Sequence, residues 1–104
     1  MNNARVFIYE MGYTQQEFGN VLNSGFTTEP SPYRCQPQSP DGWLVRHEQH
    51  PFQVSIQLKP LPARVLGAIA LPVLEVRFEV TQDSDTQSDA FFDKFFKYFH
   101  KGGG

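Results

Sequence analysis

The run His47-Glu48-Gln49-His50 comes closest, in this sequence, to a pair of metal ligands. Two histidines three residues apart can share an ion when they lie on one face of a helix. Here they stand at the end of a strand-like run, just before Pro51. Because a protein zinc site needs at least three protein ligands and no third is identifiable, we expect no metal site and no cofactor.

Cys35 is the only cysteine, and with His47 it could in principle act as a nucleophile with its base. Residues 33–38 and 43–48 are expected to pair as a hairpin, in which cross-strand neighbours lie about 5 Å apart. A lone buried thiol is the commoner outcome, so we name no catalytic residue. Glycine-rich phosphate loops, Gly-x-Ser-x-Gly elbows and Cys-x-x-Cys pairs do not occur, which argues against familiar nucleotide, hydrolase and redox chemistry.

The same predicted hairpin concentrates aromatic, guanidinium and imidazole groups. Aromatic residues and arginine are enriched at recognition surfaces, so these side chains are candidate binding residues: Tyr33, Arg34, Trp43, Arg46 and His47. In an extended strand Trp43 and His47 share one face, and Arg46 lies on the other. The alternative is that Trp43 caps the core beside the turn while the arginines are solvated.

A second candidate surface is the segment from Pro60 to Pro72, thirteen residues whose only charge is Arg64. It is too apolar for an ordinary exposed loop. Either it forms an extra strand or a short buried segment, or it is a contact surface for another chain. In the second case we expect the apolar side chains of Val65, Leu66 and Ile69 to make the contact.

The clearest structural pattern is the aromatic run between Phe91 and Phe99. At about 100° per residue its rings share one arc of roughly 160°, opposite the charged residues: Phe91, Phe92, Phe95, Phe96, Tyr98 and Phe99. This predicts an amphipathic helix that begins at a capping box formed by Thr86 and Asp89 and ends at Gly102. The arc is wider than the roughly 100° that a core-facing helix needs.

Two further helix and strand signals lie in the first third of the chain. Residues 5–10 are β-branched and aromatic at both odd and even positions, which is typical of a strand that is central or covered on both faces. Thr14 and Glu17 match a capping box, which predicts a helix beginning there. Gly25 is placed to end it as a left-handed residue.

Later segments alternate between apolar and polar residues. Ser39-Pro40-Asp41-Gly42 predicts a tight turn within the hairpin. Residues 52–59 and 74–81 alternate throughout, as half-buried strands do. One face of the predicted sheet should therefore be exposed to water.

Length and charge limit the possible partners. The 104 residues suit one domain, residues 1–101, followed by a flexible glycine tail, residues 102–104. Nine scattered basic residues and a net charge of −2 argue against nucleic acid as a partner. No apolar stretch reaches the roughly 18–20 residues that span a bilayer, so we expect no membrane association. A single cysteine and the absence of a long apolar leader make the cytoplasm the expected compartment.

These elements predict an α+β fold: a two-layer sandwich in which two helices cover one face of a mainly antiparallel sheet of four to five strands. For function, we expect a non-enzymatic protein-binding or assembly module that acts through an apolar surface as a homodimer. The alternative is a small enzyme whose pocket is formed by a pair of protomers and uses His47 or His50 with Arg46 and Tyr33. That alternative rests on analogy between folds.

Overall fold

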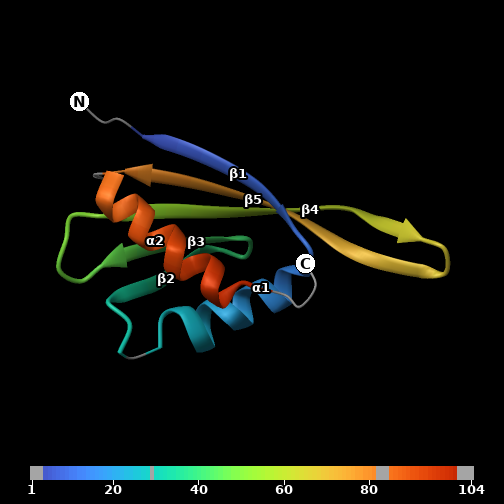
Figure 1. The fold of residues 1–104 in the computed structure, drawn as a ribbon, viewed down its shortest axis with the longest axis horizontal. Coiled ribbons are helices and arrows are strands. Elements are labelled where there is room, and N and C mark those ends of the chain that lie inside the picture. The colour runs from blue at the N-terminus through green and yellow to red at the C-terminus, as the bar shows by residue number, and fades with distance from the viewer. Residues whose placement is uncertain (1–3, 29, 82–84, 101–104) are drawn as a thin grey trace.

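The computed structural model describes residues 4–28, 30–81 and 85–100, which form one sheet covered by two helical segments (Figure 1). The strands are β1 (Arg5–Met11), β2 (Tyr33–Ser39), β3 (Gly42–His47), β4 (Gln53–Leu66) and β5 (Ile69–Thr81). Their order in the sheet is β1-β5-β4-β3-β2, and every neighbouring pair is antiparallel. The helical segments are α1 (Gln15–Val21), continued by the π-helical turn η1 (Leu22–Phe26), and α2 (Asp85–Tyr98). The predicted α+β sandwich is confirmed.

The first helical segment begins as its sequence predicts but ends differently. The Thr14 hydroxyl accepts a hydrogen bond from the backbone amide of Glu17 at 3.1 Å, and the Glu17 carboxylate accepts one from the backbone amide of Thr14 at 2.9 Å. These two bonds complete the capping box. Gly25 lies inside η1 and has no positive φ, so its predicted role as a left-handed terminator is wrong. A Cβ there would lie 3.2 Å from the Tyr98 ring. Glycine at this position therefore serves the close approach of α2.

The short hairpin forms where it was predicted. Tyr33 pairs with His47 at its open end, and Ser39 pairs with Gly42 at the turn. Gly42 also pairs with Gln57 on β4. A Cβ on Gly42 would lie 2.5 Å from the side-chain amide nitrogen of Gln57, so only a glycine fits there without displacing that side chain. The turn is also tied to α1, because the Gln15 side chain donates to the Pro40 carbonyl at 2.9 Å.

The aromatic helix α2 begins slightly before its predicted start and ends before its predicted end. It begins at Asp85, so Thr86 lies within its first turn and is not the cap that was predicted. It ends at Tyr98, although the amide of Phe99 still donates to the Phe95 carbonyl at 2.8 Å. The predicted stop at Gly102 lies outside the described residues, as does the predicted tail. Helix boundaries are the least constrained part of such patterns.

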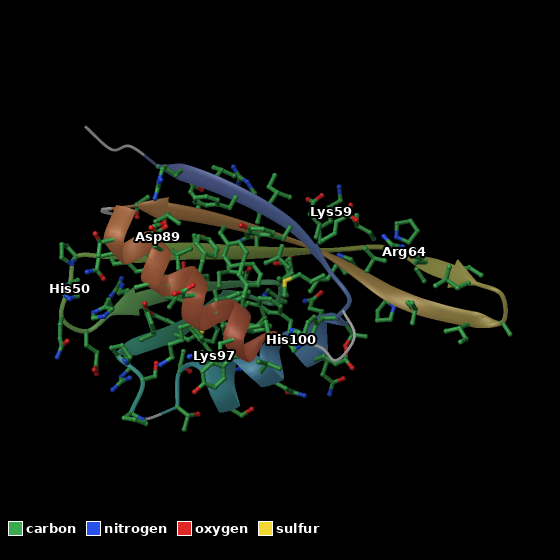
Figure 2. The ribbon with its side chains drawn as sticks, in the orientation of Figure 1. His50, Lys59, Arg64, Asp89, Lys97 and His100 are labelled. Carbon is green, nitrogen blue, oxygen red and sulfur yellow. The ribbon has the colours of Figure 1, made fainter. Side chains whose placement is uncertain are left out.

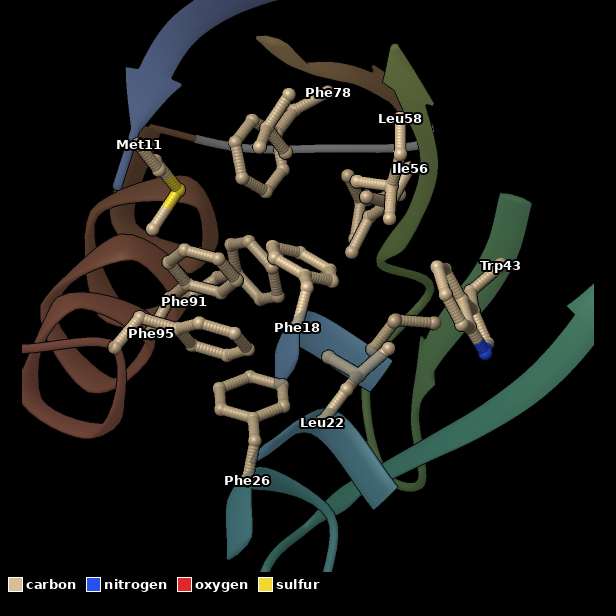
Figure 3. Packing of buried hydrophobic residues seen from close by; sticks show 14 of the residues in the cluster. Met11, Phe18, Leu22, Phe26, Trp43, Ile56, Leu58, Phe78, Phe91 and Phe95 are labelled. Carbon is tan, nitrogen blue, oxygen red and sulfur yellow. The ribbon is translucent and has the colours of Figure 1, made fainter. Parts of the chain in front are cut away.

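The core lies between the helices and the sheet, and most of it is aromatic (Figure 3). Phe91 and Phe95 are fully buried, and the Phe95 ring lies 5.0 Å from that of Phe78 on β5 and 6.0 Å from that of Phe18 on α1. The wide arc is only partly used, because Phe96 and Tyr98 remain exposed. Along β4 and β5 the apolar positions face the helices, as the alternation predicts: Val54, Ile56, Leu58, Leu74, Val76, Phe78 and Val80.

One buried polar group on α2 has no partner within the described part of the chain. The Ser88 side chain is almost completely buried, and its hydroxyl makes no hydrogen bond there. A buried hydroxyl without a partner carries a desolvation cost of about 1–3 kcal/mol. We expect Ser88→Ala to raise the free energy of unfolding by about 1 kcal/mol, measured by urea denaturation. A loss of stability of that size would mean that the hydroxyl is hydrogen-bonded in the native protein.

The two longest strands extend beyond the rest of the sheet. Within the described residues, β3 pairs with β4 only along Gln53–Gln57, and β1 pairs with β5 only as far as Leu74. Beyond these points β4 and β5 pair with each other alone and project as a two-stranded ribbon (Figure 1). We call residues 60–72 the arm. The molecule is elongated as a result, with extents of 47 × 31 × 25 Å.

Candidate functional site

The arm is a regular hairpin closed by a two-residue loop. Leu66 pairs with Ile69, and Gly67 and Ala68 form the loop between them. Gly67 has φ +62°, at the first central position of the loop. The turns that suit two-residue hairpins require a positive φ at that position, which glycine adopts without strain. The apolar segment singled out in the sequence is therefore a strand extension rather than a loop.

A bulge lies within the arm, near its base. Leu61 pairs with Val73 and Arg64 pairs with Leu71, so Pro62 and Ala63 together oppose Pro72. Such a bulge bends the ribbon and increases its twist. Each proline in the arm removes one backbone amide donor. Proline is tolerated here because both strands of the arm are edge strands.

Large apolar side chains on the arm are open to solvent. The exposed fractions are 68% for Val65, 57% for Leu66, 61% for Ile69 and 42% for Leu71. The sequence-based alternative in which this segment is buried in its own chain is therefore wrong. The reason is that the arm extends past the edge of the helical layer formed by the described helices (Figure 1).

Both faces of the arm are apolar. Directly paired residues of antiparallel strands point to the same side. Leu66 and Ile69 therefore share one face with Arg64 and Leu71, while Val65 shares the other with Ala70. Figure 2 shows Arg64, the arm's single charge, on the ribbon beyond the helices. A ribbon with apolar side chains on both faces is suited to insertion between, or along, surfaces of another chain.

A pocket of about 340 Å³ lies in the crook between the arm and the end of β1. Its lining combines the last residues of β1 with the base of the arm: Glu10, Met11, Gly12, Arg64, Leu71, Pro72 and Val73. A second pocket of about 280 Å³ shares Glu10 to Gly12 and continues under the end of α2, where it is lined by Phe96, Phe99 and His100. Both are open and mainly apolar, and the first of them continues the surface of the arm.

The aromatic binding candidates of the short hairpin belong to the core. Tyr33 and Trp43 are buried, and the Tyr33 ring stacks 5.1 Å from that of Phe26. Burial also raises the pKa of the Tyr33 hydroxyl. Trp43 packs 5.9 Å from Phe18, at one edge of the cluster (Figure 3). These two rings therefore stabilise the fold and are not part of an exposed recognition surface.

The arginines of this hairpin lie at its surface. Arg34 forms an ion pair with Glu48 and donates to the carbonyls of Ser31 and Tyr33, each at 2.9 Å. Both charged side chains of the pair are nearly half exposed, so their attraction adds little to stability. Arg46 is exposed on the sheet face opposite to that of His47. The Tyr33 ring lies 5.1 Å from that of His47, but Arg46 lies on the other face of the sheet, so the residues of the enzyme alternative do not all share one side.

His47 and His50 are neighbours without a third ligand. Their ring centroids lie 4.6 Å apart, and the amide of Gln49 donates to Nδ1 of His47 at 3.0 Å. Burial lowers the pKa of His47, the positive charge of His50 lowers it further, and Glu48 partly opposes both. No group of three potential metal ligands occurs in residues 4–28, 30–81 and 85–100.

Cys35 is not placed for nucleophilic chemistry. It pairs across the hairpin with Val45, whereas His47 pairs with Tyr33. Burial raises the pKa of the Cys35 thiol to about 11. Because the thiolate is the reactive form, the group is almost entirely protonated at neutral pH.

Sequence reasoning missed a second exposed apolar surface, on β1. The strand was expected to be central or covered on both faces, but it lies at the edge of the sheet with one face open, and that expectation is wrong. Val6 is 45% exposed and Ile8 57%. On the helix side of the same strand, the exposed Phe96 ring lies 5.1 Å from that of Tyr9. The apolar residues at both odd and even positions were the signal, because a strand at the sheet edge does not need them on its open face.

Comparison with known proteins gives no family assignment: no family model matches the chain, and neither curated proteins nor solved structures match it significantly. None of the described helices is long and apolar enough to cross a membrane.

Proposed function

We propose that this chain is a non-enzymatic protein-binding or assembly module, that the arm is its contact surface, and that it works as a homodimer. The observation that carries the proposal is the exposure of Val65, Leu66, Ile69 and Leu71 on a ribbon that the described residues do not cover. Contiguous apolar surface of this kind marks interaction sites in soluble proteins.

Magnitudes favour a second chain over solvent. Fully burying one large aliphatic side chain is worth about 1.5–3 kcal/mol, so covering the exposed fractions of these four amounts to about 3–7 kcal/mol. Association itself costs about 4–15 kcal/mol in lost freedom of motion. Covering one arm alone therefore gains about as much free energy as association costs. A symmetric dimer covers two arms for a single loss of freedom, which supports a homodimer.

The arrangement of polar groups supports binding rather than catalysis. His47 lies beside Tyr33 and His50, but Arg46 is on the opposite face of the sheet, and the Cys35 thiol is protonated at neutral pH. The pockets beside the arm are lined mainly by apolar side chains and backbone. An assembly surface needs nothing more than these features.

Light scattering tests the proposal. We expect the wild-type protein to have the mass of a dimer and Leu66→Asp or Ile69→Asp to have that of a monomer, because each places a charge in a surface that is apolar when covered. Circular dichroism should be unchanged, since both side chains are exposed. The control is Gln38→Asp, at the tip of the short hairpin, which should remain dimeric.

A wild-type protein that stays monomeric at high concentration would contradict the homodimer. If the arm variants instead lose their circular dichroism signal, and the fraction that stays folded keeps its mass, the arm is needed for the stability of the protomer. Either result is visible without knowledge of any other partner.

A further inference from the structure

The second exposed apolar surface of the molecule lies along β1. We call it the β1 edge: Val6 and Ile8 on the open sheet face, with Tyr9 and Phe96 on the helix side. Within the described residues β5 is the only strand that pairs with β1, so β1 forms one edge of the sheet. The strand contains no proline, whereas β2 at the opposite sheet edge carries Pro37 and an irregularity beside it. Natural sheet edges are usually blocked by such devices.

We infer that the arm of each copy lies along the β1 edge of a second copy, so that the two exposed apolar surfaces of one chain cover each other reciprocally. This inference rests on the proposed function, which makes the chain a homodimer that associates through its arm. It adds the location of the arm on the second copy and the symmetry of the complex.

The topology permits this arrangement with one twofold axis. Met11, the last residue of β1, pairs with Leu74, and the arm starts immediately beyond Val73. A twofold axis perpendicular to the sheet at this crook therefore carries the arm of the second copy alongside β1, with its β5 strand next to the open backbone. Ile69 lies five positions from Leu74, and Val6 lies five positions from Met11, the partner of Leu74. The β5 half of the arm therefore reaches along β1 as far as Val6.

The side chains agree with this symmetry. Alternation along β5 places Ile69 and Leu71 on the same side as Arg77, whose partner on β1 is Ile8. An axis perpendicular to the sheet keeps each face on its own side. Ile69 and Leu71 of one arm therefore meet Val6 and Ile8 of the second copy, so exposed aliphatic side chains cover each other.

Charge also favours a second copy as the occupant. Arg64 is the only charge on the arm, and Glu10 is the acidic residue of β1. Both line the pocket in the crook through which the axis passes. The twofold rotation brings each Arg64 towards the Glu10 of the other copy as well as its own. Two arms are covered for one loss of translational and rotational freedom.

Complementation between two monomeric variants tests the inference. Ile69→Asp alters the arm and Ile8→Lys alters the β1 edge, and both residues are exposed in the protomer. We expect each variant to be monomeric alone. In an equal mixture, a heterodimer has one unaltered contact and one in which aspartate faces lysine. We expect the mixture to associate at least about tenfold more tightly than either variant.

The controls are Gln38→Asp and Gln36→Lys, which place the same charges on the opposite edge strand and should remain dimeric. Circular dichroism and urea denaturation confirm folding, and Val6→Lys replaces Ile8→Lys if the latter unfolds. Mass measurements by light scattering on the separate and mixed proteins supply the result.

Three outcomes would overturn the inference. Dimeric Ile69→Asp with monomeric Ile8→Lys and no recovery on mixing would place β1 against β1, and would also count against the arm as the contact surface. Dimeric Ile8→Lys with monomeric Ile69→Asp would place arm against arm, and would leave the proposed function standing. A wild-type monomer would remove both the inference and the proposed homodimer.

Discussion

Phe95→Ala is expected to lower the free energy of unfolding by about 3–5 kcal/mol, a large part of the stability of a domain of this size. The Phe95 ring is fully buried and stacks 4.1 Å from that of Phe99, just beyond the end of its helix. It also touches Phe18 and Phe78, one from each of the other parts of the core. Truncation leaves a cavity bordered by α1, α2 and β5, which these packed elements cannot close.

Urea denaturation measures the effect of Phe95→Ala, with Lys97→Ala as its control on the exposed side of α2. Lys97→Ala should change the free energy of unfolding by less than about 0.5 kcal/mol. Lys94 is a poorer control because its ammonium lies 5.8 Å from the centroids of both the Tyr33 and Tyr98 rings. Equal urea midpoints for the two variants would contradict the packing of α2 described above.

Val76→Asp is expected to prevent folding, whereas Ile69→Asp on the same strand is expected to leave the stability of the protomer within about 0.5 kcal/mol. Val76 is fully buried beneath the helices. A carboxylate there has no partner of opposite charge, and the cost of burying it reaches or exceeds the whole stability of a small domain. Ile69, in the arm, stays in water after the same substitution.

Circular dichroism separates the two results, and urea denaturation of Ile69→Asp should be followed on the monomer at low concentration. A folded Val76→Asp protein would mean that this part of β5 is not in the core. An unfolded Ile69→Asp protein would mean that the arm is tied to the core, contrary to its position beyond the helical layer.

The alternation in β4 and β5 was enough to predict which residues of the sheet face the helices. Side chains of a strand point alternately to its two faces, so once one face is covered the residues that it buries are fixed. The same reasoning could not predict how far the strands extend, because the arm is apolar at both odd and even positions and shows no alternation. Nothing in such a pattern separates a strand buried on both faces from a strand exposed on both.

The helices show the same division between local and tertiary signals. The capping box of Thr14 and Glu17 is local, and it was predicted correctly. Gly25 looked like a terminator by its place in the sequence, but its role comes from Tyr98, at the far end of the chain. The width of the aromatic arc on α2 was predicted, but not which rings are buried. Phe95 packs on Phe78 inside the sheet, whereas Phe96 lies against Tyr9 on the edge strand β1 and stays exposed.

The sequence was enough to predict which segment forms the candidate site, but not its conformation or its position in the fold. Low charge between Pro60 and Pro72 identified the arm, since apolar residues without alternation are unusual in loops. The β1 edge went unnoticed because the position of a strand in a sheet is set by the pairing of distant residues. Tyr33 and Trp43 were grouped with surface arginines because composition cannot tell which face of a hairpin meets the core.

The order of the strands also sets an order of events in folding. From β2 to β5 every strand pairs with the one that follows it in the chain, so these pairings close only short loops. β1, in contrast, pairs with β5, from which it is separated by most of the sequence. Local pairings form sooner than distant ones. Of the five strands in this sheet, β1 is therefore the first to be synthesised and the last to join, and its apolar side chains stay exposed until β5 has been made.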